Sequence, residues 1–187
     1  MLKLSRDKRN LLKIVFCVVD KKYQVWRSIL NIEKNRPYRV LVVCMGNICR
    51  SPTGEAVLNA KAKELSVDIE VDSAGTIAYH AGEHADPRSR SAGQARGYDF
   101  SSIRARQVTQ TDFEFFDEIL CADKQNLADL HAVCPEQYQS KLKLFLSYGA
   151  KEINEIPDPY YGGENGFEFV LDLIENASDA FLRQLPK

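Results

Sequence analysis

At 187 residues with 44% hydrophobic content, the chain is long enough for one well-buried α/β domain and short for two. Its five cysteines are irregularly spaced, which argues against a disulfide scaffold and predicts a reducing, cytoplasmic location. The net charge of −1 is unevenly divided, because residues 1–39 hold eleven Lys or Arg against three acids (+8) and the remainder holds fourteen against twenty-three (−9).

Residues 1–37 form a basic extension whose apolar spacing fits a helix moderately and a hairpin turning near Asp20 almost as well. Contact with an acidic membrane surface is one interpretation. We favour a solvated cover on the domain, or sequence upstream of the functional start. No apolar run approaches the roughly 20 residues of a membrane span, and Ile14–Val19 is too short for a typical secretory signal. No nucleic-acid partner is expected, since aromatic and glycine patterns of such modules are missing from this segment.

The next segment predicts a buried strand, a tight loop and the start of a helix. Val40–Val43 is apolar and largely β-branched, as in a parallel strand covered on both faces. The cysteine loop, Cys44–Arg50, follows and contains Gly and Asn, which adopt unusual backbone angles readily. Ser51 is predicted to be the helix N-cap, with Pro52 at the first position and Glu55 in the first turn.

Such a loop favours an anion site with a reactive thiol. Successive N–H groups that end on a helix N-terminus form a concave site for a tetrahedral oxyanion, and Arg50 adds a planar fork of donors. We expect this positive environment to favour the thiolate of Cys44, which would be a nucleophile beneath a bound phosphate. Two buried structural cysteines or a zinc pair are the alternatives, but a C-x4-C spacing is not the usual short zinc spacing.

The remaining chain alternates predicted helices and strands, which indicates a parallel sheet with right-handed crossovers. The expected strands are Val67–Val71, Glu118–Ala122 and Lys141–Leu146. The expected helices are Thr53–Leu65, Pro87–Gly97 with its arginines on a solvated face, a capped turn at Thr111–Phe116, a helix capped by Asp123, and Gly166–Leu185.

Two loops contain residue types that suit a site. The loop from Asp72 to Pro87 should border the cysteine loop, because ligands bind beyond the carboxyl ends of parallel strands. Its His80 and His84 could pair on a metal, but flanking Gly and Pro argue against a shared helix. Further on, Asp158 lies between two prolines and precedes two tyrosines, so it is a held carboxylate and a candidate general acid.

With these motifs in view, residues 38–185 resemble the low-molecular-weight protein tyrosine phosphatases. The shared motifs are C-x-G-N-I-C-R-S-P at 44–52, D-S-A-G at 72–75, A-R-Q at 105–107 and D-P-Y-Y-G at 158–162. The resemblance implies one phosphatase domain over residues 38–187. It also implies an α/β three-layer sandwich whose four-stranded parallel sheet has the order 2-1-3-4 and is flanked by helices.

The resemblance also implies roles for individual residues. Cys44 would be the nucleophile, Arg50 and the loop amides would hold the phosphoryl oxygens, and Asp158 would protonate the tyrosine oxygen and then activate water. The expected phosphate-binding and loop-supporting residues are Met45, Gly46, Asn47, Ile48, Cys49, Ser51 and Ser73. Tyr79, Tyr160 and Tyr161 would form a deep aromatic mouth, and Cys49 could form a reversible disulfide with Cys44.

The implied activity is hydrolysis of phosphotyrosine through a phosphocysteine, with no cofactor and no metal. The implied partners are phosphotyrosine-containing proteins, with a tyrosine kinase among the candidates, and the sequence leaves the oligomeric state open.

An arginine phosphatase is an alternative, although it typically carries Thr where this chain has Ile48. A thioredoxin-coupled arsenate reductase needs a cysteine relay that Cys121 and Cys134 are spaced too widely to match, and a noncatalytic phosphate-binding module is disfavoured by the acid and nucleophile. Several relatives support the loop asparagine with a histidine, which is replaced around Ile103 here.

Overall fold

The computed structural model describes residues 36–149, 152–161 and 164–185. The predicted basic extension lies outside these residues except for its last two. Within the described chain a parallel sheet is formed by β1 (Tyr38–Cys44), β2 (Ile69–Gly75), β3 (Glu118–Cys121) and β4 (Leu142–Leu144). The strand order is β2-β1-β3-β4, so the predicted order is confirmed.

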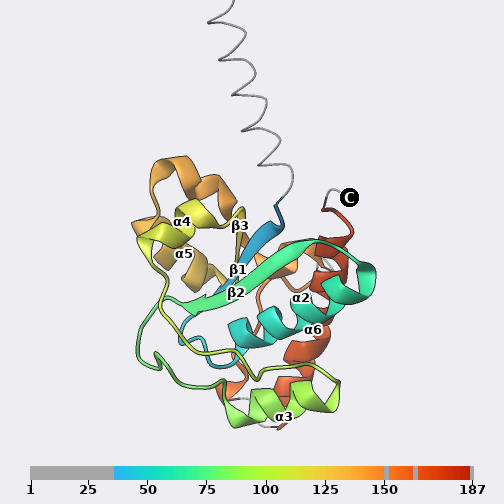
Figure 1. Cartoon of the computed structure of the whole chain (residues 1–187). Helices are drawn as coiled ribbons and strands as arrows, with labels where there is room; N and C mark the ends of the chain where they lie inside the picture. The colour runs from blue at the N-terminus through green and yellow to red at the C-terminus, as the bar shows by residue number, and fades with distance from the viewer. Residues whose placement is uncertain (1–35, 150–151, 162–163, 186–187) are drawn as a thin grey trace, which may run out of the picture. The chain divides into compact units, whose positions relative to one another are not determined.

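Helices cover both faces of this sheet (Figure 1). They are α2 (Arg50–Leu65), α3 (Pro87–Ala95), α4 (Gln110–Phe115), α5 (Lys124–Val133) and α6 (Glu164–Leu182), and 3-10 turns lie at Glu136–Lys141, Phe145–Tyr148 and Pro159–Tyr161. Figure 1 shows α2 and α6 on one side of the sheet and α4 and α5 on the other. The predicted three-layer sandwich is therefore confirmed.

The two faces follow from the alternation of side chains along the central strand. Val40 and Val42 of β1 pack with buried residues of α2 and α6, whereas Leu41 and Val43 pack with Phe113 and residues of α5 on the other side. All four β1 side chains are fully buried. A strand buried on both faces needs no polar alternation, which explains its uniformly apolar sequence.

Several predicted boundaries are wrong. The second strand begins at Ile69 rather than at Val67, because Val67 still closes the end of α2 by donating its N–H to the carbonyl of Ala62. The fourth strand ends at Leu144 instead of continuing to residue 146. There the chain turns into a 3-10 helix that buries Phe145 on the α2 side, so the apolar run reflects burial rather than extended pairing. Helix α6 begins and ends earlier than predicted.

Helix α3 is joined to α6 by one arginine with several acidic partners. Arg96 forms ion pairs with Glu168, Asp172 and Glu175, which lie on α6. The sequence predicted only a solvated basic face here. Because the three acids are spaced at helical intervals, they share one face and a single guanidinium reaches all of them.

Candidate active site

The cysteine loop joins the carboxyl end of β1 to the start of α2, as predicted, and its backbone forms a concave surface. Asn47 has a φ of 55°, a left-handed conformation that lets the chain reverse within a few residues. The surrounding chain donates backbone N–H groups to several of the loop carbonyls, from Thr76 to Cys44, from Ile77 to Met45, from Asp86 to Ile48 and from Thr53 to Cys49. In a trans peptide the N–H points opposite to the carbonyl of the same peptide bond. Because these carbonyls face the surrounding chain, the N–H groups of the same peptide bonds face the concave side. That arrangement suits an oxyanion.

Gly75 lets the loop approach β2 closely. A Cβ atom at this position would lie 2.6 Å from the carbonyl oxygen of Met45 and 3.2 Å from the backbone nitrogen of Asn47. Both neighbours are backbone atoms of the cysteine loop, so neither can rotate away. The glycine of the D-S-A-G motif is therefore required by the close packing of the loop against the end of β2.

Cys44 lies buried at the base of the loop beside Ser51. The Cys44 Sγ is 3.0 Å from the Ser51 Oγ, and Ser51 is fully buried. The prediction that Ser51 caps α2 is wrong, since the helix already begins at Arg50 and the cap position is Cys49. The Ser51 hydroxyl instead lies among polar groups, with the Asn47 Nδ2 at 2.8 Å and the Ala74 carbonyl at 3.3 Å.

Asn47 is held by three polar groups. Its Nδ2 donates to the Ser51 Oγ at 2.8 Å and to the Ser73 Oγ at 2.9 Å, and its Oδ1 accepts the backbone N–H of Arg106 at 2.9 Å. These bonds use both N–H donors and the carbonyl oxygen of an amide that is 1% exposed. The loop asparagine therefore has polar support from Ser51, Ser73 and the backbone of Arg106.

Arg50 is fixed in place by oxygen atoms from two other loops. Its Nη1 donates to Asp123 Oδ2 at 2.5 Å and to the carbonyl of Ile156 at 3.2 Å, while Nη2 lies 3.4 Å from Asp158 Oδ2. Burial alone would lower the pKa of the guanidinium, but Cys44 and these carboxylates outweigh it and raise the pKa. Arg50 is therefore a permanent positive charge at the loop.

Asp123 is a site residue that sequence reasoning identified only as a helix cap. Its Oδ1 does accept the backbone N–H of Asn126 and caps α5, while Oδ2 binds Arg50. One carboxylate thus links the start of a helix to the guanidinium. The available signal was its position two residues after β3, beyond the carboxyl ends of the strands, where Cys44 ends β1.

Asp158 lies at the opening of the same concave surface, where the structure brings it together with Cys44 and Arg50. Its side chain is 45% exposed, and its Oδ1 accepts the backbone N–H of Tyr160 at 3.0 Å. This bond lies at the start of the 3-10 turn Pro159–Tyr161. The carboxylate is consequently oriented by its own loop and still accessible to a ligand.

The concave surface opens into a pocket of about 610 Å³. Its lining residues are Cys44, Met45, Gly46, Ile48, Cys49, Arg50, Ile77, Tyr79, His80, Asp158 and Tyr160. Tyr79 is 82% exposed and packs edge-on against His80, whose Nδ1 lies 2.8 Å from Glu83. The described residues include no cluster of three or more His, Cys, Asp or Glu suited to a metal ion. The Tyr161 side chain lies outside the described part of the chain.

Arg88 supports the Tyr160 side of the mouth, a role that the sequence did not indicate. Its guanidinium is held by Asp86 at 2.8 Å, donates to the backbone carbonyl of Tyr160, and lies over the rings of Tyr160 and Phe167. Stacking of a guanidinium on an aromatic face is a favourable cation–π arrangement. The mouth is thus assembled from α3, the 3-10 turn and α6.

The other described cysteines are poor nucleophiles in this structure. Burial raises the pKa of Cys49 to about 12, although the nearby Ser89 hydroxyl opposes the shift. Burial likewise raises the pKa of Cys121 to about 12. Cys44, Cys49, Cys121 and Cys134 are all free thiols. A buried thiol that stays protonated reacts slowly with oxidants and esters.

Glu55 is buried behind the cysteine loop, contrary to the prediction that it sits in the first helical turn. Because α2 starts at Arg50, Glu55 falls one turn later and faces β2, where its Oε2 accepts the Ser73 hydroxyl at 2.6 Å. It is only 9% exposed. Burial raises its pKa to about 7 despite the Ser73 hydrogen bond and the charge of Arg106, and Asp72 adds to the rise.

This raised pKa predicts a pH-dependent stability. The folded state binds the Glu55 proton more tightly than the unfolded state does, so the free energy of unfolding should fall as the pH rises from about 4.5 to about 7. Glu55→Gln removes this titrating group. Its free energy of unfolding, relative to that of the wild type, should therefore increase by about 3 kcal/mol between pH 4.5 and pH 8. Urea unfolding of both proteins at the two pH values measures this difference. A constant difference would contradict the prediction.

Comparisons with known proteins identify the family to which the chain is similar. A family model described as low molecular weight phosphotyrosine protein phosphatase matches residues 39–187. A low molecular weight phosphotyrosine protein phosphatase of Homo sapiens is 40% identical over 78% of this chain and 94% of its own length. A Streptomyces coelicolor protein named low molecular weight protein-tyrosine-phosphatase is also 40% identical, over 78% and 92%. The crystal structure of a protein tyrosine phosphatase from Entamoeba histolytica matches with a TM-score of 0.76 and 41% identity, covering 79% of this chain and 96% of that one.

Proposed function

The chain belongs to the low molecular weight phosphotyrosine protein phosphatase family, and we propose that it hydrolyses phosphotyrosine in proteins through a phosphocysteine intermediate. The observation that carries the mechanism is the convergence of Cys44, Arg50 and Asp158 on one pocket whose base is lined by loop amides. A nucleophile, a fixed positive charge and an accessible carboxyl group are the components that phosphoryl transfer from a phenol requires.

In the first step the Cys44 thiolate attacks phosphorus and the bond from phosphorus to the tyrosine oxygen breaks. Asp158, as the carboxylic acid, gives its proton to the departing oxygen, since a phenolate with a pKa of about 10 is a poor leaving group at neutral pH. Arg50 and the amides of the cysteine loop hold the nonbridging oxygens throughout. Their fixed charges and dipoles stabilise the charge of the loose transition state.

In the second step water replaces tyrosine at the pocket opening. The Asp158 carboxylate takes a proton from the water, whose oxygen attacks phosphorus while the bond from sulfur to phosphorus breaks. Inorganic phosphate and the Cys44 thiolate result, and Asp158 is again protonated for another cycle. Ser51, 3.0 Å from the sulfur, stabilises the thiolate as it leaves.

The pocket walls support phosphotyrosine as the substrate. Tyr79 and Tyr160 extend the mouth, and Met45, Ile48 and Ile77 add apolar surface on which an aromatic ring packs. A phosphoserine side chain is too short to carry its phosphate from a protein backbone to the base of such a mouth. Tyr161 as a further wall stays a prediction. The match over residues 39–187 supports the proposed domain start near Tyr38, and the free thiols support a reducing, cytoplasmic location.

A substrate comparison with one protein preparation tests this function. We expect turnover of a phosphotyrosine peptide and of p-nitrophenyl phosphate, much slower turnover of a phosphoarginine peptide, and no arsenate reduction with thioredoxin. Ile48→Thr is the matched variant, since the smaller polar side chain should raise the phosphoarginine rate relative to the phosphotyrosine rate. Faster wild-type turnover of phosphoarginine would make the chain an arginine phosphatase instead.

A further inference from the structure

A continuous chain of hydrogen bonds links the buried Glu55 to the sulfur of Cys44. Glu55 Oε2 accepts the Ser73 hydroxyl at 2.6 Å, and Ser73 and Ser51 both contact the Asn47 Nδ2, at 2.9 and 2.8 Å. The Ser51 Oγ then lies 3.0 Å from the Cys44 Sγ. All four residues between and including Glu55 and Ser51 are at most 9% exposed, so bulk water does not compete for these bonds.

Counting donors and acceptors fixes the direction of this chain. The Arg106 backbone N–H can only donate, so it requires the Asn47 Oδ1 on its side and turns the Asn47 Nδ2 toward the two serines. Both serine oxygens therefore accept from Asn47, and each keeps a single hydrogen to donate. The hydrogen of Ser51 is then available to the sulfur, with the Ala74 carbonyl at 3.3 Å as a weaker competitor.

The hydrogen of Ser73 needs an acceptor of its own, and Glu55 supplies it. Without that acceptor the Ser73 hydroxyl would turn, and its oxygen would no longer be held in place for the Asn47 amide. Asn47 would then keep its left-handed conformation with one bond fewer. The Arg106 amide thus orients one side of Asn47, and Glu55, acting through Ser73, orients the other.

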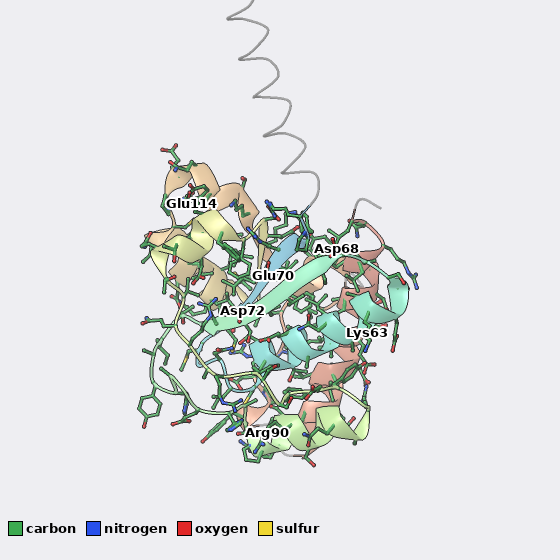
Figure 2. All side chains as sticks on the ribbon, in the orientation of Figure 1. Lys63, Asp68, Glu70, Asp72, Arg90 and Glu114 are labelled. Carbon is green, nitrogen blue, oxygen red and sulfur yellow. The ribbon has the colours of Figure 1, made fainter. Side chains whose placement is uncertain are left out.

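Glu55 lies in a charged environment that is otherwise balanced. Asp72 in the middle of β2 (Figure 2) and Arg106 are the charged side chains whose fields reach it. Arg106 is itself paired with Asp72 and Asp112, and no ion pair of Glu55 exists among the described residues. A buried carboxyl group without an ion-pair partner costs stability, which argues that it serves the site rather than the fold.

We propose that Glu55 is a positioning residue for Cys44, because its acceptance of the Ser73 hydrogen sets the direction of the bonds that run through Asn47 and Ser51 to the sulfur. The inference rests on the proposed function for the role of Cys44 as nucleophile. It assigns no contact with substrate to Glu55. Its effect is on the thiolate, which the Ser51 hydrogen bond stabilises.

The test follows the reactivity of Cys44 directly. Iodoacetamide alkylation is measured against pH, with mass spectrometry of the Cys44 peptide, for the full chain and for Glu55→Met, which keeps the side-chain volume and removes the acceptor. We expect the pH of half-maximal alkylation to rise by about one unit and kcat on p-nitrophenyl phosphate to fall about tenfold, since the hydrogen bond to the charged sulfur is weakened. Glu55→Gln keeps an acceptor oxygen and should restore most of both values.

Two controls separate positioning from packing. Ser73→Ala should raise the pH of half-maximal alkylation as much as Glu55→Met does. The double variant should raise it no further, because both changes interrupt the same chain of hydrogen bonds. Glu118→Gln alters another buried carboxyl group that accepts from a hydroxyl, that of Tyr38. Glu118 is the first residue of β3, at the end of the strand away from the cysteine loop, so this variant should leave the alkylation profile unchanged.

An unshifted alkylation profile in Glu55→Met would overturn the proposal even if its kcat fell, as would a Gln variant as impaired as the Met variant. If the wild type hydrolysed no phosphate ester while the profile still shifted, the proposed function would fail and the positioning role would stand.

Discussion

Replacing Cys44 by Ser is expected to reduce hydrolysis of phosphotyrosine peptides and p-nitrophenyl phosphate by at least about 10⁴-fold, to below detection. The reason lies in the ionisation of the nucleophile. A thiol gives up its proton far more readily than a hydroxyl does, and the thiolate is the nucleophile. The serine oxygen would stay protonated and would be a much weaker nucleophile.

Steady-state assays with both substrates measure this loss, and circular dichroism shows whether the variant folds. The matched control is Cys134→Ser, which also exchanges a buried sulfur for oxygen but lies at the end of α5, where its Sγ contacts the carbonyl of Pro135. We expect this control to retain turnover. A Cys44→Ser enzyme that kept a substantial fraction of the wild-type rate would exclude Cys44 as the nucleophile.

Asp158→Asn is expected to slow phosphotyrosine hydrolysis about a thousandfold and to slow esters of more acidic phenols much less. An amide cannot supply the proton that a phenolate needs, whereas a good leaving group departs without it. The asparagine still accepts the Tyr160 N–H, so the local turn should persist. A series of aryl phosphates with increasingly acidic phenols measures the dependence of kcat on the leaving group.

Asp68→Asn serves as its control, because this exposed carboxylate lies just before β2, at the opposite end of that strand from the pocket (Figure 2). It should leave the whole series unchanged. If Asp158→Asn lowered kcat equally for all leaving groups, Asp158 would not be the general acid. The loss of rate would then come only from removing a negative charge near Arg50.

The parts of the site that are contiguous in sequence were the predictable ones. The apolar run Val40–Val43 predicts a strand buried on both faces of the sheet. The residue types from Cys44 to Pro52 predict a tight anion-binding turn from local sequence alone. Asp158 is separated from Arg50 by more than a hundred residues, yet its two flanking prolines identify it as a held carboxylate. The strand order came from the resemblance to a family, because residue spacing alone does not specify which strands pair.

The residues that sequence reasoning missed act through tertiary contacts. Asp123 has the pattern of an ordinary N-cap, and its second oxygen finds Arg50 only once β3 lies beside β1. Glu55 looks like a helix-dipole residue until the helix start moves to Arg50 and turns it inward. The earlier start places Glu55 in the second turn, and the packing of α2 against β2 then buries it beside Ser73, a tertiary contact that local patterns do not specify.

The anchoring of Arg50 by Asp123 and Ile156 has a consequence for what the pocket distinguishes. An arginine that is free in solution loses about 2 kcal/mol of rotamer entropy when a ligand immobilises it. Here that loss occurs as the chain folds, so a tetrahedral oxyanion binds with little further ordering. This advantage is shared by the ester and by the inorganic phosphate that its hydrolysis releases. Retention of the product is therefore built into the same contacts that strengthen capture of the substrate.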